Sequence, residues 1–162
     1  MKKSLLVLSL LLLLIPIQMI SQEVFTHKEA GVQLTIPGGW FYEQDGNNIT
    51  FYPEQKDFVV SITIHELSSI DKIIDALIED LSKSYSSIDL SDPKDDEING
   101  LKGWEIHGTA KADGVDISID YGIYATPTNK IMEIGAVASV DTFEKYKKEI
   151  ETILNGIKPI DD

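Results

Sequence analysis

EIHGTAKADGVDISID, residues 105–120, sets the strand pairing of this chain, because it holds the dipeptide Asp113-Gly114 between two runs of alternating residues. Asp-Gly is a strong short-range signal of a two-residue β-hairpin turn, since both turn positions need a positive φ. Counting outward from the turn fixes the cross-strand pairs. On the face expected to meet the core, they are Ala112–Val115, Ala110–Ile117, Gly108–Ile119, Ile106–Tyr121 and Trp104–Ile123.

The other face of this hairpin is polar. Its predicted pairs are Lys111–Asp116, Thr109–Ser118, His107–Asp120 and Glu105–Gly122. Opposed Cβ atoms lie about 5 Å apart and diagonal neighbours about 7 Å apart, so His107, Asp120 and Ser118 come within reach of one another. A histidine between a carboxylate and a serine is the arrangement of a nucleophilic hydrolase.

A hydrolase also needs free backbone N–H donors for its oxyanion. Ser118 lies in the middle of a strand, where the sheet ladder uses these donors. The sequence contains no P-loop, dinucleotide-binding glycine motif, GxSxG or HExxH. We therefore predict no catalytic and no cofactor-binding residues. A polar sheet face is the favoured interpretation, and a hydrolase using Ser118 is the less favoured alternative.

A second turn is expected at Pro127-Thr128, where it would pair Thr126 with Asn129. It predicts the pairs Ile123–Met132, Tyr121–Ile134, Ile119–Ala136 and Ile117–Ala138, which complete a three-stranded meander. The same count places Glu133 opposite Gly122. His107, Asp120 and Glu133 are then weak candidate ligands for zinc or manganese, so a divalent metal is the only cofactor left open.

Upstream segments alternate like strands. The strand expected around residues 32–36 precedes the turn Pro37-Gly38-Gly39, and further strands are expected around residues 49–51 and over 58–65. A loop over residues 54–57 would place Phe51 opposite Val60.

Two segments have helical periodicity. The first covers residues 69–85 with Ser68 and Asp71 as its capping box, and the second begins at Asp141, with Glu144 three residues on. Between the first helix and the hairpin, the acidic stretch 86–97 is predicted to be a loop. It lacks the spacing of an EF-hand calcium site. His27 and His65 are both expected to be surface histidines.

The N-terminus predicts export. Residues 1–21 contain two lysines, an apolar run, Pro16 and a polar exit, which is typical of a signal peptide; retention as an anchor is the alternative. Residues 22–162 then form a single domain, outside the cytoplasm and not membrane-spanning after cleavage. The chain has no cysteine, so disulfides and thiol chemistry are excluded.

The charge argues against nucleic acid as a partner. The net charge is −13, all 14 basic residues are lysines, and loss of Lys2 and Lys3 with the signal peptide makes it −15. A chain without arginine lacks the planar fork that binds phosphate in two places at once.

The stretch GVQLTIPGGWF, residues 31–41, and the order of elements after it resemble the PsbP family, whose fold is shared by the envelope protein DcrB and the yeast Ran-release factor. The resemblance covers residues 25–160. It implies an α+β fold, with an antiparallel sheet of about six to seven strands packed with two amphipathic helices in the order β-β-β-α-β-meander-α. It also implies an accessory, non-catalytic role in protein assemblies, with metal bound by some members.

The leading hypothesis is an exported, non-enzymatic accessory module that binds a protein partner in the cell envelope. A protein that binds a small ligand or a divalent metal on the polar sheet face is the alternative. The partner and the oligomeric state stay open, and so does the side of the sheet that each helix covers.

Overall fold

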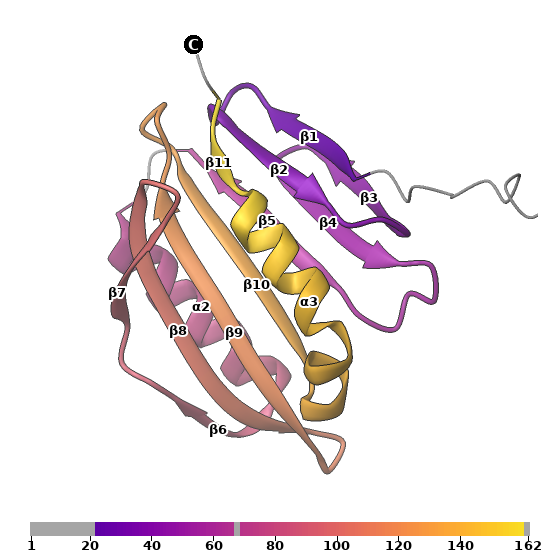
Figure 1. Cartoon of the computed structure of the whole chain (residues 1–162). Coiled ribbons are helices and arrows are strands. Elements are labelled where there is room, and N and C mark those ends of the chain that lie inside the picture. The colour runs from indigo at the N-terminus through magenta and orange to yellow at the C-terminus, as the bar shows by residue number, and fades with distance from the viewer. Residues whose placement is uncertain (1–21, 67–68, 161–162) are drawn as a thin grey trace, which may run out of the picture.

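The computed structural model describes residues 22–66 and 69–160, which form two antiparallel sheets and two helices (Figure 1). The large sheet has eight strands, in the order β3-β4-β5-β10-β9-β8-β6, with β7 also paired to β8. These strands are β3 (Trp40–Asp45), β4 (Asn48–Pro53), β5 (Val60–His65), β6 (Ser86–Leu90), β7 (Lys94–Ile98), β8 (Leu101–Ala112), β9 (Val115–Ala125) and β10 (Ile131–Ser139). The small sheet joins β1 (Glu23–His27), β2 (Val32–Ile36) and β11 (Lys158–Pro159).

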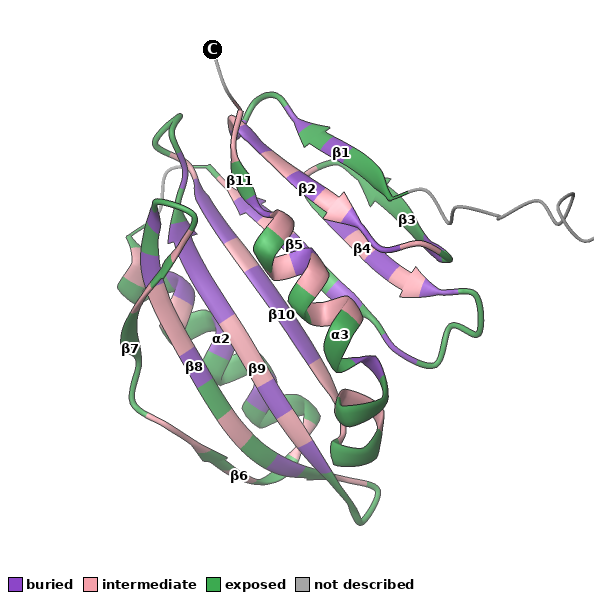
Figure 2. Cartoon of the chain, viewed as in Figure 1, coloured by how far each residue is buried: buried purple, intermediate pink, exposed green. Residues whose placement is uncertain are grey.

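The two helices cover opposite faces of the large sheet (Figure 1). Helix α2 (Ile70–Ser84) buries Ile73, Leu77 and Leu81 against one face. Helix α3 (Val140–Gly156) buries Tyr146 and Ile153 on the other face, in a core shared with the small sheet. The strands between the helices are buried over much of their length (Figure 2). The α+β class with an antiparallel sheet and two helices is thereby confirmed.

The 105–120 hairpin forms as predicted. Asp113 and Gly114 have φ values of 50° and 83°, as the two-residue turn requires. All the cross-strand pairs from Ala112–Val115 to Trp104–Ile123 are present, and so is His107–Asp120. The pairing of Phe51 with Val60 is also confirmed.

The second turn has three residues, so the predicted register of β10 is wrong by one residue. Thr126 pairs with Lys130 through N–H···O at 2.9 Å, and Asn129 has φ 61°. Met132 therefore lies opposite Tyr124, and Glu133 lies opposite Ile123. A slip of one residue moves each side chain to the other face of the sheet.

The acidic stretch 86–97 is not a loop. It contributes most of β6 and β7, which pair one after the other with the outer edge of β8. A strand as long as β8 presents a row of unpaired backbone N–H and C=O groups, and this hydrogen bonding outweighs the low strand propensity of the aspartates. These two strands bring the large sheet to eight.

The helix caps lie beside the predicted positions. Ser69 caps α2 by accepting from the N–H of Lys72, whereas Ser68 lies outside the described residues. Ser139 caps α3 by accepting from the N–H of Thr142, two residues before the expected start at Asp141. Serine at this position satisfies a backbone donor of the first turn.

The turn at Pro37-Gly38-Gly39 leads into a buried aromatic. The ring of Trp40 is only 8% exposed and makes edge contacts with Phe58 and Tyr146. The predicted signal peptide lies outside the described residues. Over residues 22–66 and 69–160, neither helix combines the length and the apolar character that crossing a membrane requires.

Candidate functional site

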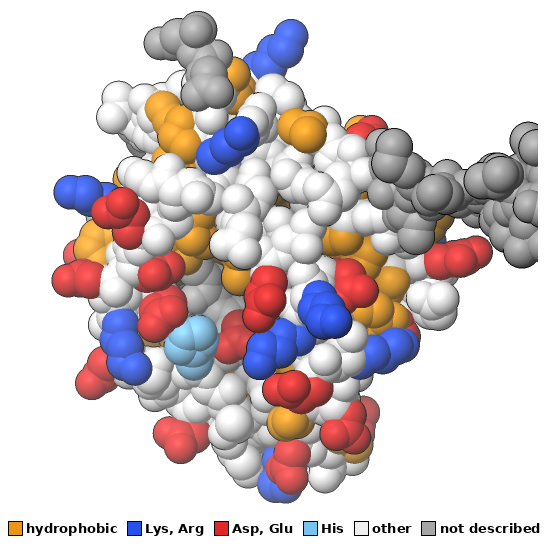
Figure 3. Space-filling model, in the orientation of Figure 1, with side chains coloured by type: hydrophobic (Ala, Val, Ile, Leu, Met, Phe, Trp, Pro, Cys, Tyr) orange, Lys and Arg blue, Asp and Glu red, His pale blue; other side chains and the backbone are white. Residues whose placement is uncertain are grey.

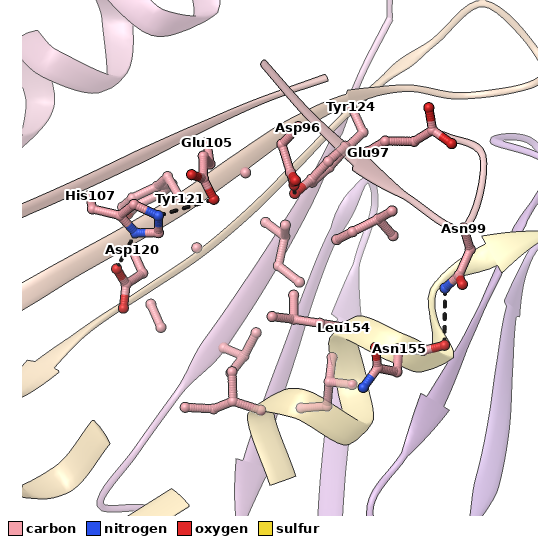
Figure 4. Close-up of a pocket in the computed structure, with 18 of the residues that line it drawn as sticks. Asp96, Glu97, Asn99, Glu105, His107, Asp120, Tyr121, Tyr124, Leu154 and Asn155 are labelled. Carbon is pink, nitrogen blue, oxygen red and sulfur yellow. Dashed lines mark hydrogen bonds and ion pairs between the residues drawn. The ribbon is translucent and has the colours of Figure 1, made fainter. Parts of the chain in front are cut away.

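A groove of about 450 Å³ lies between α3 and strands β7, β8 and β9 (Figure 4). It exists because α3 packs mainly on β2, with further contacts to β9 and β10. The face of β8 on this side is left without a helical cover (Figure 1). The hairpin of β8 and β9 thus supplies one wall of the groove, and α3 supplies the other.

The two walls differ in chemistry. The helix wall presents Phe143, Ile150 and Leu154, which are half-buried apolar side chains. The sheet wall presents Glu105, His107 and Asp120. Such a combination of an apolar surface with a few polar groups is typical of ligand sites.

His107 lies between two carboxylates. Its Nδ1 is 2.6 Å from Oδ1 of Asp120, and its Nε2 is 3.1 Å from Oε2 of Glu105 (Figure 4). Only the imidazolium can donate from both nitrogens. Partial burial alone would lower the pKa of His107, but the hydrogen bonds and charges of Asp120 and Glu105 outweigh it and raise the pKa above its ordinary value.

The far end of the groove is closed by Tyr124, whose hydroxyl donates to Oδ2 of Asp96 at 2.5 Å. Burial, followed by this hydrogen bond and the charge of Asp96, raises the pKa of Tyr124. The ring lies over Gly103 and Gly122, where an added Cβ would come within 2.6 Å of ring atoms. Glycine at these two positions therefore makes room for the ring that forms this end.

The turn between β7 and β8 is tied to the end of α3. The side-chain amide of Asn99 donates to the backbone oxygens of Asn155 and Ile157, at 3.0 and 2.6 Å. These bonds join the strand wall to the helix wall at one end of the groove (Figure 4).

The structure does not assemble the hydrolase arrangement around His107. Both ring nitrogens of this residue are occupied by carboxylates. Ser118 lies on the central strand β9, paired with Thr109 on one side and Ala138 on the other. Its backbone groups therefore belong to the sheet ladder and are not available to an oxyanion.

The three weak metal candidates are not brought together. His107 and Asp120 lie on the α3 face, whereas Glu133 follows the corrected register to the α2 face. There Oε2 of Glu133 is 2.8 Å from Nε2 of His65. Residues 22–66 and 69–160 contain no cluster of three histidine or acidic side chains suited to a metal ion.

The expectation that His27 and His65 are surface histidines is not met. His27 is 6% exposed, and its Nδ1 accepts from the N–H of Ala30 at 3.1 Å. His65 is half-buried and paired with Glu133 in a hollow beside α2. The structure thus gives both residues contacts within the fold.

Sequence reasoning placed Glu105 on the polar face of the hairpin but did not predict its contact with His107, although residues two apart on a strand share a face. It missed the contributions of Asp96 and Tyr124 to this site. Asp96 carried no comparable signal, since its position depends on the pairing of β7 with β8.

Known structures share this fold, although no family model and no curated protein matches the sequence. Cyanobacterial PsbP (CyanoP) from Synechocystis sp. PCC 6803 is similar with a TM-score of 0.65 at 13% identity, over 89% of this chain and 95% of that chain. LpqN, described as involved in cell envelope biogenesis of Mycobacterium tuberculosis, gives 0.57 at 14% identity over 85% and 90%. A protein from Bacteroides thetaiotaomicron VPI-5482 gives 0.57 at 16% identity, over 86% of this chain and 49% of that chain. The chain has a PsbP-like fold.

Proposed function

We propose that this protein is an exported, non-enzymatic binding module of the cell envelope, and that the groove beside α3 is its ligand site. The observation that carries the proposal is the groove itself, whose volume of about 450 Å³ lies within the usual range for small-molecule sites. Its polar groups are paired with one another, which suits recognition better than bond making.

Two further observations support a place in the envelope. The predicted signal peptide over residues 1–21 would direct the chain out of the cytoplasm. LpqN, which has a similar fold, is described as a protein of envelope biogenesis.

A protein partner is the second candidate, and a different surface favours it. Phe41 on the edge strand β3 is 50% exposed and stacks on Tyr52 of β4, with the ring centroids 6.2 Å apart. Neighbouring Glu43 accepts from the Tyr52 hydroxyl at 2.6 Å, and Lys56 lies over the Tyr52 ring. Aromatic side chains in a polar surround are enriched at protein interfaces.

Ligand screening by NMR tests the groove. In ¹H–¹⁵N spectra of the exported protein, a small-molecule library should give hits that shift the amides of Gly122, Leu154 and Asn155, which line the groove. Hits confined to the surface around Phe41 would favour the partner surface instead. Ligands that bind elsewhere, or that are turned over, would contradict the proposal.

Export is tested separately by mass spectrometry of the envelope fraction. The proposal expects a mature protein whose first residue is Gln22. Recovery of the intact chain from the cytoplasm would contradict export, while leaving the groove to be judged by the NMR experiment.

A further inference from the structure

We propose that the groove beside α3 selects an amphiphilic organic cation, a ligand whose ammonium group meets Glu105 and Asp120 and whose alkyl chain lies along α3. This inference rests on the proposed function, since it names the ligand class of the same site.

The groove is strongly acidic. Its described lining includes four acidic residues and one histidine but no lysine; the charged set is Asp96, Glu97, Glu105, His107 and Asp120. Of these, the side chain of Glu97 points away from the groove (Figure 4). Acidic side chains gather on this face around the hollow beside α3 (Figure 3). Next to it, Lys147 shares a shallower hollow with Glu144 and Glu151. The field in the groove therefore attracts cations and repels anions.

The contacts of His107 show that this wall is built to hold a cation. Both ring nitrogens lie against carboxylates, so the protonated ring donates one N–H to Asp120 and one to Glu105. The carboxylates stay within reach of a ligand, because the side chains of Glu105 and Asp120 are 35% and 44% exposed. An ammonium group has three donors, so it can join or replace the imidazolium at these oxygens.

The opposite wall supplies the second half of the recognition. Ile150, Leu154 and Phe143 are only partly covered by the core, and they face the groove. Burial of apolar surface is favourable by roughly 25 cal/mol per Å², so an alkyl chain gains affinity from this wall whatever its head group. The chain therefore provides affinity, and the carboxylates provide selectivity for charge.

Three probes with the same alkyl chain separate these two contributions. Octylammonium, 1-octanol and octanoate are titrated into the exported protein near pH 7.5 at low salt, with amide shifts of Gly122 and Leu154 as the readout. We expect octylammonium to bind tightest and octanoate weakest, with at least a roughly tenfold difference in Kd. Added salt should weaken octylammonium far more than octanol.

Variants identify the groups responsible. Glu105→Gln together with Asp120→Asn should remove the preference for octylammonium over octanol. Asp75→Asn is the matched control, because it removes an exposed carboxylate from α2 on the other side of the sheet. Thermal melting verifies that each variant folds, and the salt dependence of the unmodified protein provides a test that needs no variant.

The outcomes separate the two claims. Octanol binding in the groove with octanoate as tight as octylammonium would overturn the cation selectivity and leave the groove as a ligand site. A preference that survives in the double variant would overturn the role of Glu105 and Asp120. If none of the three probes shifts the groove amides, both the selectivity and the proposed ligand site are rejected.

Discussion

The carboxylate of Asp120 lies 2.6 Å from Nδ1 of His107 on the neighbouring strand. The two-residue turn at Asp113-Gly114 fixes this pairing, because it sets the register of β8 and β9. Local turn chemistry thus positions the polar wall of the groove, and the charge of the histidine depends on that wall.

The pKa of His107 should fall when Asp120 is replaced by asparagine. The change removes the carboxylate that accepts from Nδ1, so the imidazolium loses a hydrogen bond and an attractive charge while its partial burial remains. NMR titration of the imidazole C–H signals measures this pKa. Asp116 lies on the same strand as Asp120 but pairs with Lys111. Asp116→Asn should therefore leave the pKa of His107 unchanged. An equal effect of the two variants would show that the general field, and not the Asp120 contact, raises the pKa.

His107 should stabilise the fold more in mild acid than in alkali. Because its pKa is raised in the folded state, its contribution is fully present below the unfolded value of about 6.5 and is lost as the pH rises through the folded value. The side chain is 49% exposed, so we expect a contribution below about 1 kcal/mol. Urea unfolding of the protein and of His107→Gln, at about pH 5.5 and at about pH 9, measures the difference.

The control for this pH dependence is again Asp116→Asn. This variant leaves His107 and its contacts with Asp120 and Glu105 in place, so the stability difference that it causes should be nearly the same at the two pH values. A His107→Gln effect that is larger at the higher pH would contradict the predicted sign.

Tyr124→Phe should loosen β7 specifically. The variant removes the hydroxyl that donates to Asp96 but keeps the ring over Gly122, so the loss is one partly buried hydrogen bond, about 1 kcal/mol in the free energy of unfolding. Amide hydrogen exchange should increase over residues 94–98. Tyr42→Phe, in an exposed aromatic of β3, serves as the control. Unchanged exchange in β7 would mean that its backbone bonds to β8 hold it alone.

Local strand pairing can be predicted from the sequence where the turn residues and the apolar alternation require the same register. At Asp113-Gly114 the two-residue turn and the apolar alternation agree, and the whole register follows. β10 differs because both of its faces are covered. Ile131 and Val137 face the α2 core, while Met132 and Ile134 face the α3 core, so either register places apolar residues inside.

Pairing between distant segments was harder to predict. Asp96 comes from a stretch of low strand propensity that becomes a strand only because the edge of β8 is available. The His65–Glu133 contact needs the pairing of β5 with β10, which are separated in the sequence by α2 and four strands. The groove depends on both local and distant pairing. Its His107–Asp120 pair lies within one hairpin, whereas its Tyr124–Asp96 pair requires β7 to pair with β8.

Asn129 should be the residue that holds β10 in register. Its φ of 61° lies in the left-handed region, as the third position of a three-residue hairpin loop requires, and asparagine and glycine tolerate this region best. Asn129→Ala should therefore lower the free energy of unfolding by about 1 kcal/mol, whereas Asn129→Gly should be neutral or slightly stabilising. Urea unfolding measures both variants. Equal losses for alanine and glycine would show that the asparagine side chain matters through its contacts, and that backbone conformation at this position does not set the register.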